Sequence, residues 1–359
     1  MVSEVRVSHY RSLRDMTLPL SGLTVIVGPN GCGKTNLYRS LYLLHAAARG
    51  ELARTLAAEG GTPSVLWAGP RKKGPMRLML GVTVEQFDYE LVCGLPEPND
   101  LPSAFHLDPL LKEETVRFRD GKSSVLLLER GKSGAMARDA EGKRASFPMM
   151  LTRSESVLSQ ISEPHRFPHL SALRDLLTRW RFYHAFRTDE GSPLRQPQIG
   201  TFTPVLSHDG RDLAAALQTI LEIGDSDGLR EAVGGAFPGA ELEVVAEQGR
   251  FRVRLHQPGL LRPLEAYELS DGTLRYLCLL TALLSPRPPS LLALNEPETS
   301  LHPDLLPSLA DLIVQAAGNT QVWVTTHSKI LAKAIENKRG GRPVGLTLRD
   351  GETRLATSS

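Results

Sequence analysis

The chain has 359 residues, 41% of them hydrophobic and 23% charged, which is typical of an ordered globular protein with a substantial core. Its net charge of +2 permits a nucleic-acid partner but lacks the strongly basic character of many nucleic-acid-binding domains. We see no apolar leader, no run approaching the ~18 apolar residues of a membrane span, and no metal-ligand spacing among the cysteines. We therefore expect a cytoplasmic protein without a membrane segment.

The first motif lies near the N-terminus, after two predicted strands at 2–8 and 16–20. Residues 23–27 are an apolar, β-branched run that predicts a buried strand. Directly after it, GPNGCGKT at 28–35 fits the P-loop pattern G-x-x-x-x-G-K-[ST]. A helix is expected next, ending near Gly50. Strand, glycine loop and helix form the context that this motif requires.

The residue types of the loop suit the binding of a nucleotide. Its glycines allow backbone N–H groups to surround phosphate oxygens, assisted by the positive end of the helix. Lys34 would reach the β- and γ-phosphates, and the Thr35 hydroxyl would ligate Mg²⁺. The predicted cofactors are therefore ATP and Mg²⁺. The predicted binding residues of the loop are Gly28, Pro29, Asn30, Gly31, Cys32, Gly33, Lys34, Thr35 and Asn36.

The middle of the chain alternates short strand and helix patterns. Residues 77–93 predict two strands of an antiparallel side sheet that meet near residues 85–86. Residues 95–210 hold many prolines and glycines without a sustained heptad repeat, which predicts an inserted α/β region rather than a coiled coil. A helix follows at 211–221. Residues 241–257 predict a hairpin.

Three clusters of basic residues suit phosphate contacts. An ordinary solvated protein face is the favoured alternative for each of them. The clusters are Arg250, Arg252 and Arg254, which share one face of a strand, Arg71, Lys72 and Lys73 in a predicted loop, and Arg179, Arg181 and Arg187 near a predicted helix-to-strand junction.

Residues 269–275, LSDGTLR, precede an apolar helical stretch. They resemble the LSGGQ signature of ABC ATPases, with Ser270 and Gly272 at its Ser and second Gly. Ser-Asp-Gly is also a common helix N-cap and turn. The motif alone leaves both interpretations open.

A second apolar strand, at 290–296, ends in Asn295 and Glu296. Glu296 is a candidate base that orients and polarises the attacking water. Asn295 can accept a hydrogen bond from a metal-bound water through its amide oxygen, but it lacks the charge of the more usual Asp. The alternative for Glu296 is an ordinary acid at a helix start.

A third apolar strand is predicted at 322–326 and leads into His327. A histidine at a strand end often has a structural role, and that alternative stays open. The chain continues with a predicted helix. A pair of strands with a turn at residues 350–351 is expected at the end of the sequence.

Taken in order, these motifs resemble the SMC/RecF/OLD branch of ABC ATPases, within the group of small AAA_21-like ATPases. The resemblance rests on the P-loop region, on NEPETSLHP at 295–303 and on TTHS at 325–328. It implies an α/β P-loop NTPase of the ABC-type head, with a mixed central sheet and an antiparallel side sheet. We expect residues 1–94 and 211–359 to form the nucleotide-binding lobe, and 95–210 to form an inserted α/β lobe in place of a coiled coil. Few residues follow His327 in this sequence, so we expect no OLD-type nuclease domain in it.

The resemblance also implies roles for residues and partners. Ser270 and Gly272 would contact the γ-phosphate bound to a second copy, His327 would be the switch histidine, and Arg11 would lie near the nucleotide. The protein is expected to form an ATP-dependent homodimer, head to tail, and to act in a DNA-linked process such as repair or phage defence. The alternative is a weakly hydrolysing regulatory module that controls an effector protein. Asn295 keeps that alternative open.

Overall fold

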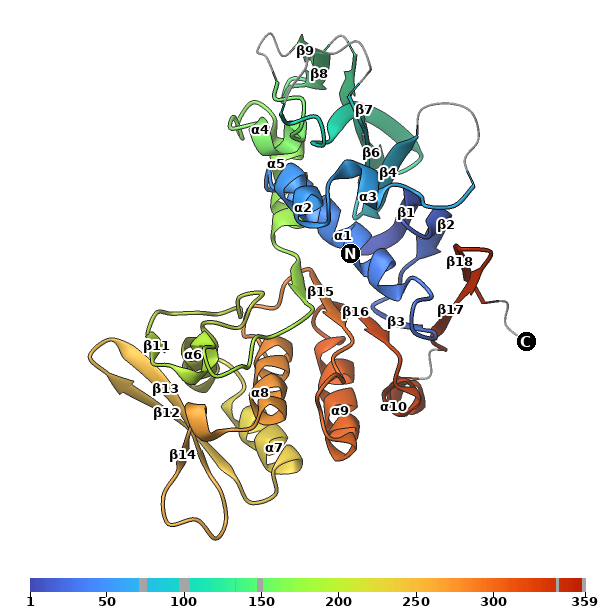
Figure 1. Ribbon diagram of the computed structural model, residues 1–359. Helices are drawn as coiled ribbons and strands as arrows, with labels where there is room; N and C mark the ends of the chain where they lie inside the picture. The colour runs from blue at the N-terminus through green and yellow to red at the C-terminus, as the bar shows by residue number, and fades with distance from the viewer. Residues whose placement is uncertain (71–75, 97–103, 133, 147–150, 340–341, 357–359) are drawn as a thin grey trace. The chain divides into compact units, whose positions relative to one another are not determined.

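The computed structural model describes residues 1–70, 76–96, 104–132, 134–146, 151–339 and 342–356. The chain forms two compact units (Figure 1). Unit 1 comprises Met1–Ser21, Gly28–Trp180 and Gly345–Ser359, and unit 2 comprises Gly22–Val27 and Arg181–Val344.

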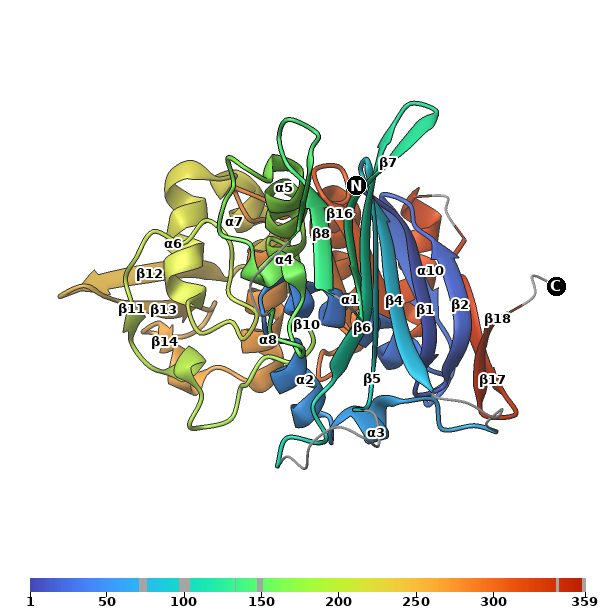
Figure 2. The same cartoon turned by 90° about the horizontal axis from the view of Figure 1, so that it is seen from above.

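Unit 1 is built on an antiparallel sheet in the order β2-β1-β4-β5-β6-β7-β8-β9. Figure 2 shows β2, β1, β4, β5 and β6 side by side. Buried residues alternate along β5, as expected for a strand with one face on the core. The strands are β1 (Val2–Tyr10), β2 (Leu13–Pro19), β4 (Arg77–Val84), β5 (Phe87–Gly94), β6 (Leu110–Asp120), β7 (Ser123–Gly131), β8 (Gly134–Arg138) and β9 (Arg144–Ser146).

This sheet confirms the predicted antiparallel side sheet, including the turn between β4 and β5, where Glu85 has φ 52°. The strands β6 to β9 lie within the predicted insertion, and β6 pairs directly with β5. They therefore continue the same sheet. The expected lobe boundaries near residues 95 and 210 stay a prediction.

The helices of unit 1 pack around α1, the helix that follows the P-loop. It contacts α5, α2, α4 and strands β1 and β4. Its buried His45 places Nδ1 2.8 Å from the carbonyl oxygen of Leu177 at the end of α5. The helices are α1 (Lys34–Ala48), α2 (Leu52–Ala58), α3 (Thr62–Val65), α4 (Val157–Gln160) and α5 (Pro168–Thr178).

The C-terminal hairpin, β17 (Val344–Arg349) and β18 (Glu352–Leu355), confirms the predicted terminal strand pair. Its turn residues Asp350 and Gly351 both have positive φ, as a two-residue type I′ turn requires. Strand β18 contacts β2.

Unit 2 contains a parallel sheet in the order β10-β15-β16-β3. Its strands are β10 (Arg181–Tyr183), β15 (Leu291–Asn295), β16 (Gln321–Thr326) and β3 (Leu23–Val27). Strands β15 and β16 are buried along their whole length, which explains why their sequences are nearly continuous apolar runs. The predicted strands at 23–27, 290–296 and 322–326 are thus confirmed.

Helices α8, α9 and α10 lie next to one another in unit 2 (Figure 1). A second small sheet contains the predicted hairpin β12–β13, with Gln248 and Gly249 at its turn. The helices are α6 (Leu213–Ile223), α7 (Ser226–Ala236), α8 (Asp271–Leu283), α9 (Leu306–Ala316) and α10 (Lys329–Arg339), with the 3₁₀ turns η1 (Pro193–Arg195), η2 (Ala266–Glu268) and η3 (Pro303–Leu305). The small sheet comprises β11 (Gln198–Ile199), β13 (Arg250–His256), β12 (Glu241–Glu247) and β14 (Leu264–Glu265). Across the described ranges, no helix is long and apolar enough to cross a membrane.

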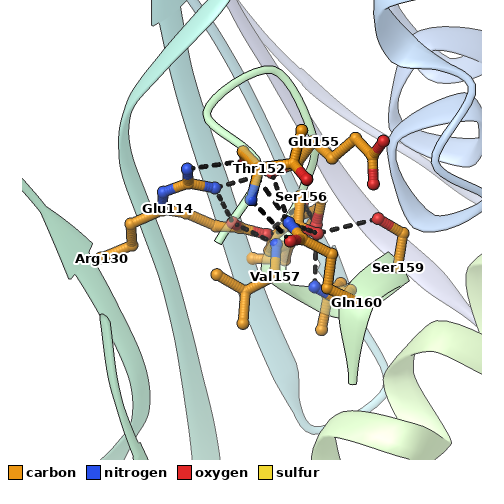
Figure 3. Close-up of polar contacts among 10 residues, drawn as sticks. Glu114, Arg130, Thr152, Glu155, Ser156, Val157, Ser159 and Gln160 are labelled. Atoms are coloured by element: carbon orange, nitrogen blue, oxygen red, sulfur yellow. Dashed lines mark hydrogen bonds and ion pairs between the residues drawn. The ribbon is translucent and has the colours of Figure 1, made fainter. Parts of the chain in front are cut away.

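A buried polar cluster around Glu114 joins β6 to the start of α4 in unit 1 (Figure 3). The Glu114 carboxylate accepts hydrogen bonds from the hydroxyls of Ser156 (2.5 Å) and Tyr89 (3.0 Å) and from the Val157 N–H (2.8 Å). Arg130 places Nη1 4.0 Å from it. Burial raises the pKa of the Glu114 carboxyl, while the hydrogen bonds and Arg130 oppose this shift.

Replacing Glu114 by Ala should lower the free energy of unfolding by about 3–5 kcal/mol, because it leaves buried donors and the Arg130 charge without their acceptor. Glu114→Gln should cost less, since its amide oxygen can still accept from Ser156. Urea denaturation of both variants measures the difference. An alanine variant as stable as wild type would show that the cluster is dispensable.

Candidate functional site

The P-loop leaves β3 at Gly28 and enters α1 at Lys34. A Cβ atom at Gly33, where φ is 102°, would lie 2.1 Å from Oγ1 of Thr353, and one at Gly28 would lie 2.6 Å from the Leu346 carbonyl oxygen. The C-terminal hairpin therefore packs directly on the loop. Only glycine fits at these two positions without displacing it.

The remaining loop residues show how the loop is held. Lys34 is 3% exposed and its Nζ donates to the carbonyl oxygens of Gly28 (2.9 Å) and Pro29 (3.1 Å). Its ammonium therefore faces the backbone of its own loop. Cys32 is buried. A Cβ on Gly31 would meet open space.

The first turn of α1 and the turn after β1 meet through Ser12. The Asn36 amide donates to the Ser12 hydroxyl at 2.8 Å. Arg11, at φ 49°, donates from Nη2 to the Glu59 carboxylate at 2.8 Å. Arg11 thus lies in the same unit as the P-loop, with its guanidinium held by Glu59. Thr35 is half-buried in this first turn.

In unit 2, the acidic residue after β15 and the histidine after β16 come together. Asn295 pairs with Thr325 in the parallel ladder, and the Glu296 N–H donates to the Thr325 carbonyl oxygen at 2.8 Å. His327 Nδ1 lies 3.8 Å from Oε1 of Glu296. Glu296 has φ 48°, a left-handed conformation that costs energy in a residue with a Cβ and is often found at functional sites.

Asn295 is 1% exposed, and both ends of its amide are engaged. The Thr325 hydroxyl donates to its Oδ1 at 2.6 Å, and its Nδ2 lies 2.7 Å from Nδ1 of His184. These contacts set the orientation of the side chain. The amide oxygen keeps a second lone pair, which could accept from a metal-bound water.

Sequence reasoning missed Glu298 and Arg275. Glu298 is buried and accepts a hydrogen bond from the His327 N–H at 2.9 Å. The one feature of the sequence that points to Glu298 is the presence of a second acidic residue two positions after Glu296. Arg275 of α8 donates to the carbonyl oxygen of Glu296 at 3.3 Å, and burial lowers its pKa while the Glu298 and Glu296 charges oppose the shift. An arginine inside an otherwise apolar helix is the sign that could have revealed it.

Ser270 is the N-cap of α8, because its hydroxyl accepts from the Thr273 N–H at 3.1 Å. The capping role considered for this residue is therefore observed. A Cβ on Gly272 would lie 2.8 Å from the Ser300 carbonyl oxygen. The start of α8 thus lies against the segment that follows Glu298.

Arg195 of η1 holds the loop before α8, and sequence reasoning missed it too. It donates to the carbonyl oxygens of Leu269 (2.7 Å) and Tyr267 (3.0 Å) and to the Asp271 carboxylate (2.6 Å). Its side chain is 11% exposed. Nothing in its local sequence predicts these contacts, because the residues that it binds follow some seventy positions later.

The predicted basic face of β13 is partly neutralised within its own unit. Arg252 pairs with Glu247 and Arg254 with Glu265, both at 2.6 Å. The Arg71–Lys73 cluster lies outside the described residues. In the part of the chain that the structure describes, no group of three or more His, Cys, Asp or Glu residues could hold a metal ion.

Two family models match the chain. Residues 152–332, just over half of the chain, match the AAA_21 family, described as "AAA domain, putative AbiEii toxin, Type IV TA system". Residues 1–60, which include the P-loop, match a family described as "AAA ATPase domain".

Short segments match curated proteins. The chain is 48% identical over 44 residues to an OLD nuclease of Thermus scotoductus, and 49% identical over 49 residues to the DNA replication and repair protein RecF of Corynebacterium jeikeium. These segments are 12% and 13% of this chain. The chain covers only 8% and 12% of the lengths of these relatives.

The whole chain resembles solved SMC head structures. An SMC head bound to the C-terminal winged-helix domain of ScpA matches with a TM-score of 0.57 at 16% identity, covering 100% of this chain and 98% of the other. A Pyrococcus furiosus SMC head with an extended coiled coil matches with a TM-score of 0.54 at 14% identity, covering 100% and 96%. This likeness confirms the predicted α/β P-loop fold of the ABC-type head. With the family match over half of its length, the chain belongs to the AAA_21 family.

Proposed function

We propose that the protein is an ATP-driven switch that binds and hydrolyses ATP and forms a head-to-tail homodimer while ATP is bound. One observation carries this proposal. The P-loop, the Asn295–Glu296 pair and His327 directly follow β3, β15 and β16, which are neighbours in one parallel sheet. The carboxyl edge of a parallel sheet is where α/β proteins bind their ligands.

The residues of the P-loop suit a triphosphate. Its backbone N–H groups and the start of α1 would surround the phosphates, and Lys34 would leave the carbonyls of its own loop to pair with the β- and γ-phosphates. Thr35 and Asn295 would hold Mg²⁺, Asn295 through a metal-bound water. The ion supplies neutralisation of charge on the β- and γ-phosphate oxygens.

Hydrolysis would rely on positioning. Glu296 would orient and polarise the attacking water, and His327 would contact the γ-phosphate and sense its loss. Ser270 and Gly272 of a second copy would close over the same γ-phosphate. The hydroxyl of Ser270 can do this while it caps α8, because a hydroxyl accepts and donates at the same time. Arg11 would lie near the nucleotide, on the same unit as the P-loop.

The change of state would alter the affinity of the dimer for DNA or for a partner protein. The process would be repair or phage defence, in the cytoplasm. The matched segments of RecF and OLD nuclease support a DNA-linked role. Residues 1–94 and 211–359 would act as the nucleotide lobe, and 95–210 would provide the surface that differs from SMC proteins.

A second candidate is a regulatory module that holds ATP, hydrolyses it weakly and controls an effector protein. The observation that favours it is the neutral Asn295, whose amide oxygen already accepts from Thr325. An uncharged group binds the Mg²⁺ shell less strongly than a carboxylate. Steady-state phosphate release with and without duplex DNA separates the two candidates.

Lys34→Ala should abolish ATP binding, since it removes the charge that pairs with the phosphates, whereas Glu296→Gln should trap an ATP-bound dimer by slowing hydrolysis. Size-exclusion chromatography with light scattering, with and without ATP and Mg²⁺, measures both. Arg230 forms an exposed ion pair with Asp227 and provides the control: Arg230→Ala should dimerise as wild type does. A Glu296→Gln variant that binds ATP normally and stays monomeric would contradict the head-to-tail scheme.

Asn295→Asp should raise ATP turnover and lower the Mg²⁺ concentration needed for half-maximal rate, because it restores the carboxylate that strengthens the Mg²⁺ shell. Phosphate release measured over a Mg²⁺ titration tests this. Unchanged turnover and an unchanged Mg²⁺ requirement would show that Asn295 does not limit hydrolysis.

Arg195→Ala should weaken ATP-dependent dimerisation at least about tenfold while ATP binding by the monomer stays intact, because the loop before α8 loses the donors that order it. Dimer dissociation constants and fluorescent ATP titrations give the two quantities separately. Equal dimer affinity in both proteins would refute the ordering role of Arg195.

A further inference from the structure

Glu298 carries a buried carboxylate that has no assigned step in the proposed hydrolysis. Its side chain is 5% exposed, compared with 30% for that of Glu296. Taking a carboxylate out of water costs several kcal/mol unless donors replace the lost water. The contacts of Glu298 therefore indicate what this residue is there to hold.

The hydrogen bonds of the Glu298 side chain all come from the segment 326–328, which contains His327. Oε1 of Glu298 accepts from the Thr326 hydroxyl (2.5 Å) and from the backbone N–H groups of His327 (2.9 Å) and Ser328 (3.1 Å). These bonds fix the backbone between β16 and α10. They bring the same oxygen next to the imidazole of His327.

The ring of His327 has two acidic neighbours, and Glu298 is the nearer. Its Nδ1 lies 3.2 Å from Oε1 of Glu298 and 3.8 Å from Oε1 of Glu296. The shorter distance also involves the more deeply buried carboxylate, where water screens the interaction less. Glu298 is therefore the principal partner of Nδ1.

A carboxylate oxygen beside a ring nitrogen repels a lone pair there and attracts an N–H group. The proton of the neutral imidazole is thereby kept on Nδ1, and Nε2 carries the free lone pair. This effect acts on the reactive end of His327 without any contact between Glu298 and substrate.

The negative charge of Glu298 also acts on Arg275, in addition to the hydrogen bonds that Oε1 accepts. Among the described residues, its Oε2 has no hydrogen-bond partner although the atom is buried. The Arg275 guanidinium is close enough for the Glu298 charge to oppose the lowering of its pKa by burial. An amide could accept the same backbone bonds at a smaller desolvation cost.

We propose that Glu298 is a positioning residue that holds His327 in the Nδ1–H tautomer, so that Nε2 is the ring nitrogen that exchanges a hydrogen bond or a proton at the γ-phosphate. This inference rests on the proposed ATPase function for its effect on turnover. The tautomer itself is independent of turnover.

A double-mutant cycle on ATP turnover tests the effect on the reaction. Glu298→Gln should lower kcat about tenfold, as loss of an outer partner of a functional histidine does, with the KM for ATP unchanged. In a His327→Ala background, Glu298→Gln should lower kcat no further, because its effect passes through the imidazole. A further loss of the same size in that background would overturn the proposal.

Nitrogen-15 NMR of histidine-labelled protein tests the tautomer, with the His327 signals assigned by their loss in His327→Ala. Wild type should show the Nδ1–H form, and Glu298→Gln should shift the population toward Nε2–H. Asp304→Asn is the matched control, because Asp304 lies 3.3 Å from Nδ1 of His302 in an exposed pair. It should leave both kcat and the His327 signals unchanged.

The two tests separate this inference from the proposed function. If wild type shows no ATP turnover, the ATPase proposal fails, and the NMR result still decides the role of Glu298. If wild type turns over ATP and His327 is in the Nε2–H form, the inference on Glu298 fails and the ATPase proposal stands.

Discussion

The register of the parallel strands β15, β16 and β3 is the constraint on which the candidate site depends. Asn295 stands opposite Thr325, and Thr326 stands opposite Val27. Parallel strands point the same way, so the segments that follow them start from one edge of the sheet. A slip of one residue in β16 would turn its side chains to the opposite face. It would separate Thr325 from the Asn295 amide and Thr326 from the Glu298 carboxylate.

At the carboxyl edge of the parallel sheet, the buried polar residues stand at the ends of strands β15 and β16. Asn295, Thr325 and Thr326 are almost fully buried at the ends of strands made otherwise of apolar residues. Each has a hydrogen-bond partner on a neighbouring segment, as buried polar groups require. A neutral amide is cheaper to bury than a carboxylate. Asn295 therefore suits its buried place at this edge, while the negative charge just beyond the strands is carried by the partly exposed Glu296 and by the buried Glu298, whose carboxylate is stabilised by hydrogen bonds.

Elements marked by local sequence patterns could be predicted. Elements and contacts that depend on residues far apart in the chain could not. The P-loop with its flanking elements and the hairpin turns at residues 248–249 and 350–351 follow from glycine spacing and strand patterns. The pairing of β6 with β5 does not, because a long connection separates these two strands in the sequence. The ring nitrogen of His184 reaches Asn295 across 111 positions of the chain. Such a contact is set by the topology of the sheet, so motif spacing could predict Glu296 and His327 but not their supporting residues.

The start of α8 shows how a structural cap and a proposed ligand contact can share one residue. The Ser270 hydroxyl satisfies a backbone donor that a free helix start would expose. Arg195 fixes the preceding loop through backbone carbonyls, so the loop is ordered before any partner arrives. Ordering a loop only on binding would subtract from the affinity of the complex. A pre-ordered Ser270, whose hydroxyl also shares a hydrogen bond with the Thr273 hydroxyl at 2.8 Å, would lose little entropy on meeting a phosphate. Capping and nucleotide recognition are therefore compatible, and the cap is the feature that prepares the motif for the contact.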